Sequence, residues 1–249
     1  MQKLAIISSV QPDIFSGIAK EKSFWFTPEE QKAALKGEKQ VFADAIGIPD
    51  LEKKIQIEVI HAMDGIPANY SADAYILGGS PAMVTERDQK EWINKLIKFV
   101  EWEVSKWKPI LGICFWHQIL ATALGGKVEP MSERKIGKWT FETNGEIFEG
   151  LWSHKQAVTD AGSGKIIGTW LGGMGSNSAI QMIQHDNATG MQLHPEFSPE
   201  FTAFLVKLMR WQIESEWLNA TEILEQIKTL QSNPSRALLE GFVRKYYNI

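Results

Sequence analysis

Two short segments of the sequence carry side chains that together could form a cysteine nucleophile with its base. The segment LGICFWHQIL (111–120) holds Cys114, the only cysteine of the chain, and the segment HPE holds His194 and Glu196. A cysteine that attacks a carbonyl carbon needs a base within hydrogen-bonding reach, and the base needs a carboxylate that orients it. These residue types therefore predict a catalytic triad of Cys114, His194 and Glu196.

Cys114 lies where a short apolar run gives way to a helical pattern, as a nucleophile on a sharp strand-to-helix turn would. Such a turn requires small residues two positions before and after the cysteine; Gly112 meets this requirement, whereas Trp116 does not. The partial positive charge of the helix N-terminus would stabilise a thiolate, and the N–H group of Phe115 would donate to the oxyanion. By itself, a buried apolar cysteine explains the segment equally well.

The HPE segment suits a base and its orienting carboxylate. In an extended chain, side chains two residues apart point to the same side, so Glu196 can hold one imidazole nitrogen while the other faces the sulfur. Pro195 helps because it disfavours helix at the preceding residue. Taken alone, a histidine at a strand end and a helix-capping glutamate are the simpler interpretation.

A third segment, YILGGSP (75–81), is typical of a strand that ends in a backbone-rich loop. Glycine lets the backbone approach a ligand closely, so Gly79 and Ser80 are expected to present N–H groups to the oxyanion. Such a segment alone would be an ordinary turn.

Short apolar runs bounded by Gly, Pro or charged residues predict buried parallel strands. The runs cover 3–10, 54–62, 73–79 and 109–115. Helical patterns separate them, which predicts an α/β fold: a three-layer, doubly wound, mostly parallel sheet flanked by helices. The carboxyl ends of such strands share one crevice, where Gly79 and Cys114 would meet.

The remaining elements follow from local signals. Thr27 and Pro28 predict a helix start with Glu30 completing a capping box, and Thr85 predicts another helix start. Alternating segments over 128–194 predict strands and hairpins, and helices are expected after Ser198. We expect a single domain over 1–249, with a core of about 1–205 and a C-terminal helical extension over 206–249.

Composition excludes several classes of protein. The hydrophobic fraction of 44% allows a sizeable core, and the net charge of −4 provides no basic surface for nucleic acid or acidic membranes. A single cysteine cannot form an intrachain disulfide, and no apolar run is long enough to cross a bilayer. The five histidines lack metal-ligand spacing. We therefore expect a cytoplasmic protein without metal or cofactor, acting on a small molecule.

In combination, LGICFWHQIL, HPE and ILGGSP resemble the motifs of class I glutamine amidotransferases, in the order and on the fold pattern of that family. The sequence is most similar to stand-alone, GMP synthase-like members, including γ-glutamyl peptidases. The resemblance covers about 1–205 and includes ALGGKV, the IGKW segment (136–139) and a Ser-His pair at 153–154. It implies the flavodoxin-like fold of that family.

The resemblance also implies a mechanism. Cys114 would attack the side-chain amide of glutamine, or a γ-glutamyl bond, form a γ-glutamyl thioester and release ammonia or an amine. His194 would act as general base and then acid, oriented by Glu196. Gln118 would help to shape the substrate pocket, and His117 would not be the catalytic base. Because the sequence has no phosphate-binding loop of the GxxxxGK[ST] type, any synthase would be a separate chain.

Three departures from the family pattern affect the expected site. Ser80 replaces a glycine found in many members, Lys155-Gln156 replaces Gly-Asp, and Trp116 replaces the glycine of Cys-x-Gly-His-Gln. An indole at 116 must displace the helix or turn outward into the cleft, at a cost of about 1–3 kcal/mol. We expect it to exclude free glutamine or to close the site until a partner binds. A catalytically weak binding or regulatory protein, and an acyltransferase with the same triad, stay open as alternatives.

Overall fold

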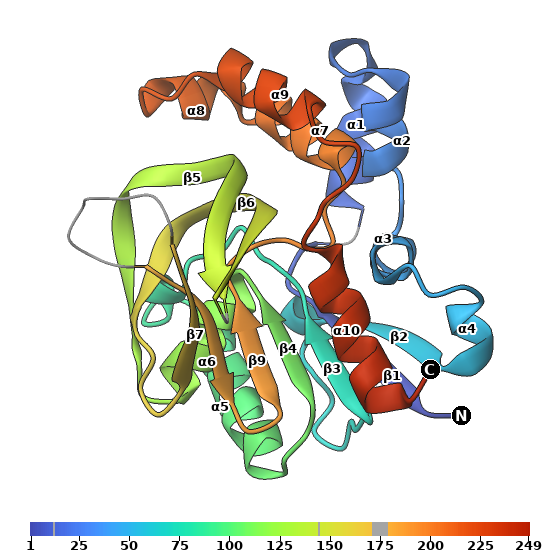
Figure 1. The fold of residues 1–249 in the computed structure, drawn as a ribbon, viewed down its shortest axis with the longest axis vertical. Helices are drawn as coiled ribbons and strands as arrows, with labels where there is room; N and C mark the ends of the chain where they lie inside the picture. The colour runs from blue at the N-terminus through green and yellow to red at the C-terminus, as the bar shows by residue number, and fades with distance from the viewer. Residues whose placement is uncertain (12, 144, 171–178) are drawn as a thin grey trace.

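A single mixed sheet connects the strands in a computed structural model of the protein, which describes residues 1–249 apart from 12, 144 and 171–178. The strand order is β2-β1-β3-β4-β9-β8-β6-β5-β7, and helices lie on both faces of the sheet (Figure 1). The predicted α/β class is therefore confirmed.

Half of the sheet is parallel, as the apolar runs predict. These strands are β1 (Lys3–Ser8), β2 (Gln56–His61), β3 (Ala74–Leu77), β4 (Ile110–Ile113) and β9 (Ala188–Met191). Each of the four predicted runs contains one strand, which is slightly shorter than the run. The core strands β1, β3 and β4 are buried along nearly their whole length, which explains their continuous apolar sequence.

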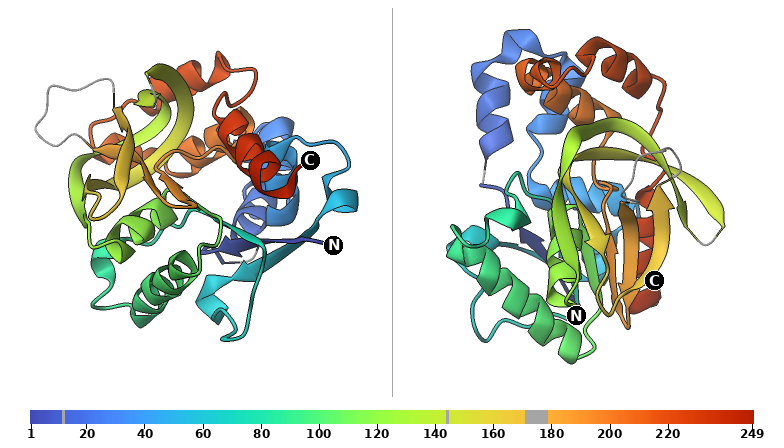
Figure 2. Two further views of the ribbon diagram at one scale, coloured as in Figure 1. Left: turned by 60° about the horizontal axis from the view of Figure 1, so that its bottom comes forward. Right: turned by 90° about the vertical axis from the view of Figure 1, so that its left-hand side faces the viewer.

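The other half of the sheet is antiparallel, so the prediction of a mostly parallel sheet is wrong. Its strands are β5 (Lys127–Thr143), β6 (Glu146–Asp160), β7 (Lys165–Trp170) and β8 (Ile180–His185). β5 and β6 are long and pair antiparallel, with Thr143 opposite Glu146, and strands that follow each other so closely in the chain can pair only in this direction. β7 pairs with both β5 and β8, and β8 also pairs with β6, so these four strands curl towards a barrel (Figure 2).

Two groups of helices cover the faces of the parallel half. On one face lie α5 (Glu91–Ser105) and α6 (Phe115–Ala123), and on the other lie α3 (Glu38–Ile46), the short α4 (Leu51–Lys54) and α10 (Arg236–Tyr247). Each face encloses its own hydrophobic cluster. Since α10 contributes Leu239, Phe242 and Val243 to one cluster, its packing supports the interpretation of 1–249 as one domain. That interpretation stays a prediction.

The remaining helices form a cap beyond the carboxyl end of the sheet (top of Figure 1). They are α1 (Ile14–Glu21), α2 (Pro28–Ala34), α7 (Pro199–Leu208), α8 (Arg210–Ser215) and α9 (Ala220–Lys228). Aromatic contacts and an ion pair between Lys207 and Glu30 (2.8 Å) join α7 to the α1–α2 segment. Because β9 leads through HPE into α7, the cap begins at the predicted site.

One of the two predicted helix starts is correct. Thr27 and Glu30 form the expected capping box at the start of α2. The start at Thr85 is wrong: that residue lies in a short 3₁₀ turn, Val84–Glu86, and α5 begins at Glu91. The hydroxyl of Thr85 instead accepts a hydrogen bond from the side chain of Gln156 on β6. A tertiary contact has therefore replaced the local capping interaction.

Candidate active site

Cys114 occupies a strained turn between β4 and α6. Its backbone has φ 52° and ψ −101°, in a region that side-chain-bearing residues seldom adopt. A Cβ atom on Gly112 would lie 2.9 Å from the carbonyl oxygen of Trp116, so only glycine fits at the crossing of strand and helix. The side chain of Cys114 is 4% exposed. The turn thus presents the sulfur at the N-terminus of α6, where the helix dipole favours an anion.

His194 and Glu196 form a buried pair beside this turn. His194 Nδ1 lies 2.7 Å from Glu196 Oε1, and the two side chains are each 5% exposed. Cys114 is within hydrogen-bonding contact of the same imidazole ring. The structure therefore brings the three predicted triad residues together, with the carboxylate holding one ring nitrogen.

The charges around His194 favour its protonated form. Burial disfavours an imidazolium, but the negative charges of Glu196 and Cys114, together with their hydrogen bonds to the ring, outweigh this effect and raise the pKa of His194 to about 10. At neutral pH the ring therefore carries a proton that it could pass to a leaving group.

Two further residues hold the HPE segment in place. The Phe197 ring stacks on the His194 ring with centroids 4.0 Å apart and planes inclined by 8°. Asn233, which lies between α9 and α10, donates through Nδ2 to the carbonyl oxygens of His194 (2.7 Å) and Phe197 (3.0 Å). The segment between α9 and α10 thus contacts the backbone of His194, the expected general base.

The Gly79-Ser80 loop lies against the triad. A Cβ atom on Gly79 would be 2.6 Å from Cε1 of His194, so the backbone approaches the ring as closely as glycine permits. The Ser80 hydroxyl is engaged within the loop: it donates to the carbonyl oxygen of Ser9 (3.0 Å) and accepts from the N–H of Ala82 (3.1 Å). Ser80 therefore stiffens the loop that is expected to bind the oxyanion.

Trp116 takes neither of the two positions expected from the sequence. The helix is not displaced, because α6 begins at Phe115, and the indole does not turn outward, because its side chain is 0% exposed. It packs in the hydrophobic cluster on the α5–α6 face, and its Nε1 donates to Ser9 Oγ at 2.9 Å. The expectation that the indole projects into the cleft is wrong.

The residues that follow Trp116 also face inward. His117 is fully buried with Nε2 3.0 Å from the carbonyl oxygen of Ile180, and burial lowers its pKa to about 4. Gln118 is 3% exposed and donates to the carbonyl oxygen of Gln156 (3.2 Å) and to Gln192 Oε1 (3.1 Å). Gln118 therefore lies behind Gln192 and not at an open pocket wall.

A match to a family model shows the family to which the chain belongs. The family model described as glutamine amidotransferase class-I matches residues 50–208, a range that includes Cys114, His194 and Glu196. The chain belongs to this family. The resemblance seen in the motifs is thereby confirmed.

Curated relatives of this chain include glutamine-hydrolyzing GMP synthases. That of Clostridium kluyveri is 32% identical over 139 residues, which cover 49% of the chain and 26% of the relative. That of Thermosipho melanesiensis is 31% identical over 175 residues, 64% of the chain and 31% of the relative. The matched region thus spans about a quarter to a third of these relatives.

Solved structures show the same fold. A glutamine amidotransferase from Thermotoga maritima superimposes with a TM-score of 0.65 at 15% identity, covering 98% of this chain and 96% of its own. A glutamine amidotransferase from Methylobacillus flagellatus superimposes with a TM-score of 0.59 at 17% identity, covering 99% of this chain and 92% of its own. The C-terminal helices therefore fall within the region that the neighbours share.

Sequence reasoning missed two groups that contact the sulfur of Cys114. Gln192 Nε2 lies 3.4 Å from Cys114 Sγ, and the carbonyl oxygen of Ser153 lies 3.8 Å from it. The Gln192 contact could have been predicted from the sequence, because Gln192 precedes His194 by two residues and an extended chain directs both side chains to one side. No sequence pattern predicts the Ser153 contact, since it depends on where β6 passes the Cys114 turn.

Lys155 and Gln156, which stand where the family usually has Gly-Asp, make contacts outside the triad. Lys155 pairs with Glu216 (2.7 Å), which follows α8. Gln156 is 2% exposed, and its Oε1 accepts from the N–H of Val84 (2.9 Å). Both residues therefore connect β6 to neighbouring segments.

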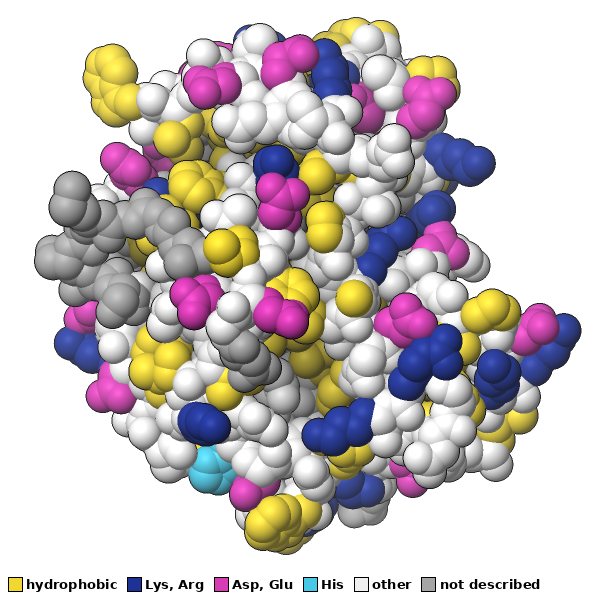
Figure 3. All heavy atoms as spheres, in the orientation of Figure 1, with side chains coloured by type: hydrophobic (Ala, Val, Ile, Leu, Met, Phe, Trp, Pro, Cys, Tyr) yellow, Lys and Arg dark blue, Asp and Glu magenta, His cyan; other side chains and the backbone are white. Residues whose placement is uncertain are grey.

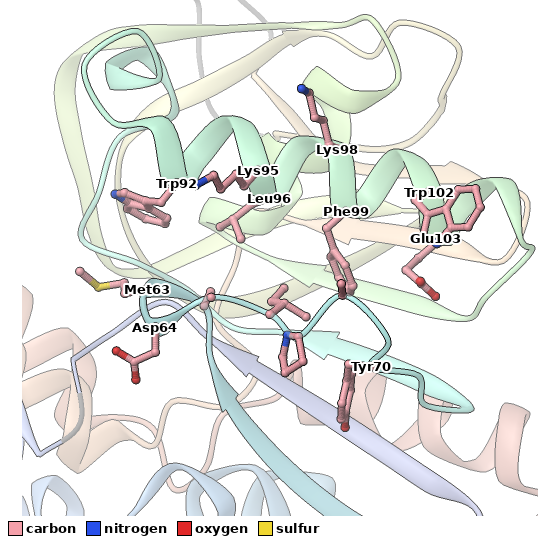
Figure 4. Close-up of a pocket in the computed structure, with 15 residues that line it drawn as sticks. Met63, Asp64, Tyr70, Trp92, Lys95, Leu96, Lys98, Phe99, Trp102 and Glu103 are labelled. Atoms are coloured by element: carbon pink, nitrogen blue, oxygen red, sulfur yellow. The ribbon is translucent and has the colours of Figure 1, made fainter.

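The described surface has grooves that are distinct from the triad. One, of about 480 Å³, lies between α5 and the 62–70 segment and is lined by Trp92, Phe99 and Glu103 among others (Figure 4). Another, of about 660 Å³, lies between α2, α3 and the start of α7. Neither is lined by the triad residues. On the face in Figure 3, acidic and basic side chains are interspersed.

In the part of the chain that the structure describes, no helix is both long and apolar enough to cross a membrane. Within the same residues, no three His, Cys, Asp or Glu side chains gather closely enough to hold a metal ion.

Proposed function

We propose that this amidotransferase cleaves the side-chain amide of glutamine, or a γ-glutamyl bond, through a thioester on Cys114. One observation carries the proposal: a cysteine on a strained strand-to-helix turn contacts a histidine that a buried glutamate holds at 2.7 Å. This is the nucleophile, base and orienting group of acyl-transfer chemistry.

The geometry supports a reaction in two halves. The Cys114 thiolate attacks the amide carbon, and the oxyanion accepts hydrogen bonds from the N–H of Phe115 and from the Gly79-Ser80 backbone. When the C–N bond breaks, protonated His194 gives its proton to the leaving nitrogen. The neutral ring then takes a proton from water, the resulting hydroxide attacks the thioester, and the acid leaves as the thiolate–imidazolium pair is restored.

The relatives support glutamine as the donor. The GMP synthases that match this chain carry glutamine hydrolysis in their names, and a protein from Thermoplasma acidophilum described as part of a GMP synthase shares the fold with a TM-score of 0.53 at 13% identity. Because the match covers only part of the synthases, we propose that the ammonia either passes to a separate synthase chain or is simply released. In the second case the protein acts as a hydrolase.

Burial of the triad favours a second candidate function. Cys114, His194 and Glu196 are only 4–5% exposed, so the site is nearly closed as it stands. A catalytically weak member that binds a partner and opens only in its presence is consistent with this closure. This alternative predicts little turnover by the isolated chain.

The test measures ammonia release from L-glutamine and amine release from a γ-glutamyl anilide by the full chain. Cys114→Ala is the control that removes the nucleophile. Turnover that Cys114→Ala abolishes, with a γ-glutamyl adduct of Cys114 seen by mass spectrometry, is the expected result. Absence of turnover and of adduct with both substrates would contradict the proposal and leave the regulatory alternative.

A further inference from the structure

We propose that Gln192 is a catalytic residue that stabilises the thiolate of Cys114, and that Gln118 is a positioning residue that sets the direction of the Gln192 amide. The inference rests on the proposed role of Cys114 as nucleophile. It adds a hydrogen-bond donor on the attacking atom itself, separate from the base and from the oxyanion groups.

The contact between Gln192 and the sulfur is direct and dry. Gln192 Nε2 lies 3.4 Å from Cys114 Sγ, within the range of hydrogen bonds to sulfur, and the Gln192 side chain is 0% exposed. The backbone is held as well, because the N–H of Gln192 donates to the carbonyl oxygen of Gln181 at 2.9 Å. With no water competing, a donor to an anion is worth more than at the surface.

A backbone carbonyl decides which end of the Gln192 amide faces the sulfur. An amide group has a donor end and an acceptor end of similar size, so its direction follows from its partners. The carbonyl oxygen of Gln156 can only accept, which assigns Nε2 of Gln118 to that contact at 3.2 Å. The second hydrogen of Gln118 Nε2 goes to Gln192 Oε1 at 3.1 Å, and Gln192 must then present its NH2 group to Cys114.

The two neighbours of the sulfur favour opposite protonation states. The carbonyl oxygen of Ser153, at 3.8 Å, can accept from a thiol but repels a thiolate. The NH2 group of Gln192 attracts the thiolate and offsets this repulsion. Unlike His194, an amide does not titrate, so Gln192 changes how much thiolate exists without transferring a proton.

Both glutamines lie on the elements that carry the reacting groups. Gln118 is one helical turn after Cys114, and its N–H donates to the Cys114 carbonyl oxygen at 3.2 Å. Gln192 is two residues before His194. The hydrogen-bonded series Gln156–Gln118–Gln192–Cys114 therefore runs through the segments that carry the nucleophile and the base, and it fixes the direction of the donor.

The experiment follows alkylation of Cys114 by iodoacetamide as a function of pH, in the full chain. Gln192→Met removes the donor at nearly constant volume and should move the midpoint of the profile up by about one pH unit, a roughly tenfold loss of reactive thiolate near neutrality. Gln118→Met should give a smaller shift in the same direction. The double variant should match Gln192→Met, because Gln118 acts through Gln192.

Gln181→Met is the matched control. Gln181 is also a buried glutamine, 1% exposed, and its side-chain Nε2 donates to the Ala179 carbonyl oxygen at 2.8 Å. It contacts Gln192 through its backbone carbonyl oxygen, which Gln181→Met keeps. Its profile should match the wild type. A shift as large in Gln181→Met would mean that any loss of a buried amide disturbs the site, and it would overturn the inference.

An unchanged midpoint in folded Gln192→Met would also overturn the inference. If Gln192→Met does not fold, Gln118→Met decides, and an unshifted midpoint there is the contradicting result. Ammonia release from glutamine is measured in parallel with wild type. A shifted midpoint in Gln192→Met without any turnover by the wild type would contradict the proposed function but support Gln192 as a donor to the thiolate. Wild-type turnover with unshifted midpoints in the variants would support the proposed function and contradict the donor role.

Discussion

The indole Nε1 of Trp116 donates a hydrogen bond to Ser9 Oγ at 2.9 Å, at the carboxyl end of β1. The carbonyl oxygen of Ser9 in turn accepts from Ser80 Oγ at 3.0 Å. A tryptophan that follows the candidate nucleophile by two residues is thus connected to the loop expected to bind the oxyanion. Its position favours a role in supporting that loop, and the turnover of Trp116 variants tests whether the indole also obstructs the substrate.

Removing the indole should cost stability and should not open the site. Trp116→Gly leaves a cavity in the cluster on the α5–α6 face, and we expect a loss of about 3–5 kcal/mol in the free energy of unfolding, measured by urea denaturation. Glutamine turnover should stay equal or fall. Trp116→Phe keeps most of the volume but loses the donor, so its stability loss should be smaller. Faster turnover in Trp116→Gly would show that the indole blocks the substrate.

Gly79 should be far less tolerant of a methyl group than its neighbour Gly78. In Gly79→Ala the new Cβ would lie 2.6 Å from His194 Cε1, which forces the ring or the loop to move. Displacement of a catalytic group on this scale typically costs roughly a hundredfold in kcat, which steady-state assays measure. In Gly78→Ala the new Cβ meets the Phe42 ring at an ordinary 3.5 Å, so kcat should change little. Equal losses in the two variants would contradict this interpretation.

Stability should fall as the pH rises through the titration of His194. Its pKa is raised from the ordinary 6.5 to about 10, because Glu196 and Cys114 overcome the burial that lowers it. A group whose pKa is higher in the folded protein contributes stability that is fully present below pH 6.5 and is lost towards pH 10. Urea unfolding at several pH values checks this, with His194→Gln as control. A decline of the same steepness in His194→Gln would assign the effect to other groups.

Asn233 should contribute both to stability and to the position of the catalytic base. Asn233→Ala removes the Nδ2 donor from the carbonyl oxygens of His194 and Phe197. The His194 oxygen keeps the N–H of Phe197 as a donor at 3.3 Å, so we expect a total cost of about 1–3 kcal/mol. We expect a lower free energy of unfolding, and a lower kcat because the segment that carries His194 is released.

Asn187→Ala is the comparison for Asn233. Asn187 Nδ2 also donates to a backbone carbonyl oxygen, that of Trp107 at 2.9 Å, but at an exposed site where water can replace it. In urea denaturation, Asn187→Ala should lose much less free energy of unfolding than Asn233→Ala, and its kcat should be unchanged. Similar values for the two variants would mean that Asn233 is only an ordinary surface-type contact.

Much of the fold was predictable because its signals are local. The apolar runs of β1 to β4 are continuous in sequence, and the capping box of Thr27 and Glu30 closes within four residues. The Cys114 turn and the His194–Glu196 pair were predictable for the same reason: each depends on residues one or two positions apart. Locality also explains the wrong helix start at Thr85, whose hydroxyl is used by Gln156, 71 residues away.

The sequence by itself determined the order of the motifs, the α/β class and the family to which the chain belongs. Only the tertiary structure decided how the strands and hairpins expected over 128–194 join the parallel strands in one sheet, the inward direction of Trp116 and the donor on the sulfur. The physical reason is sequence separation: Trp116 meets Ser9 across 107 residues, and Gln192 meets Cys114 across 78. Such contacts depend on how strands and helices pack, which no local pattern of residues encodes.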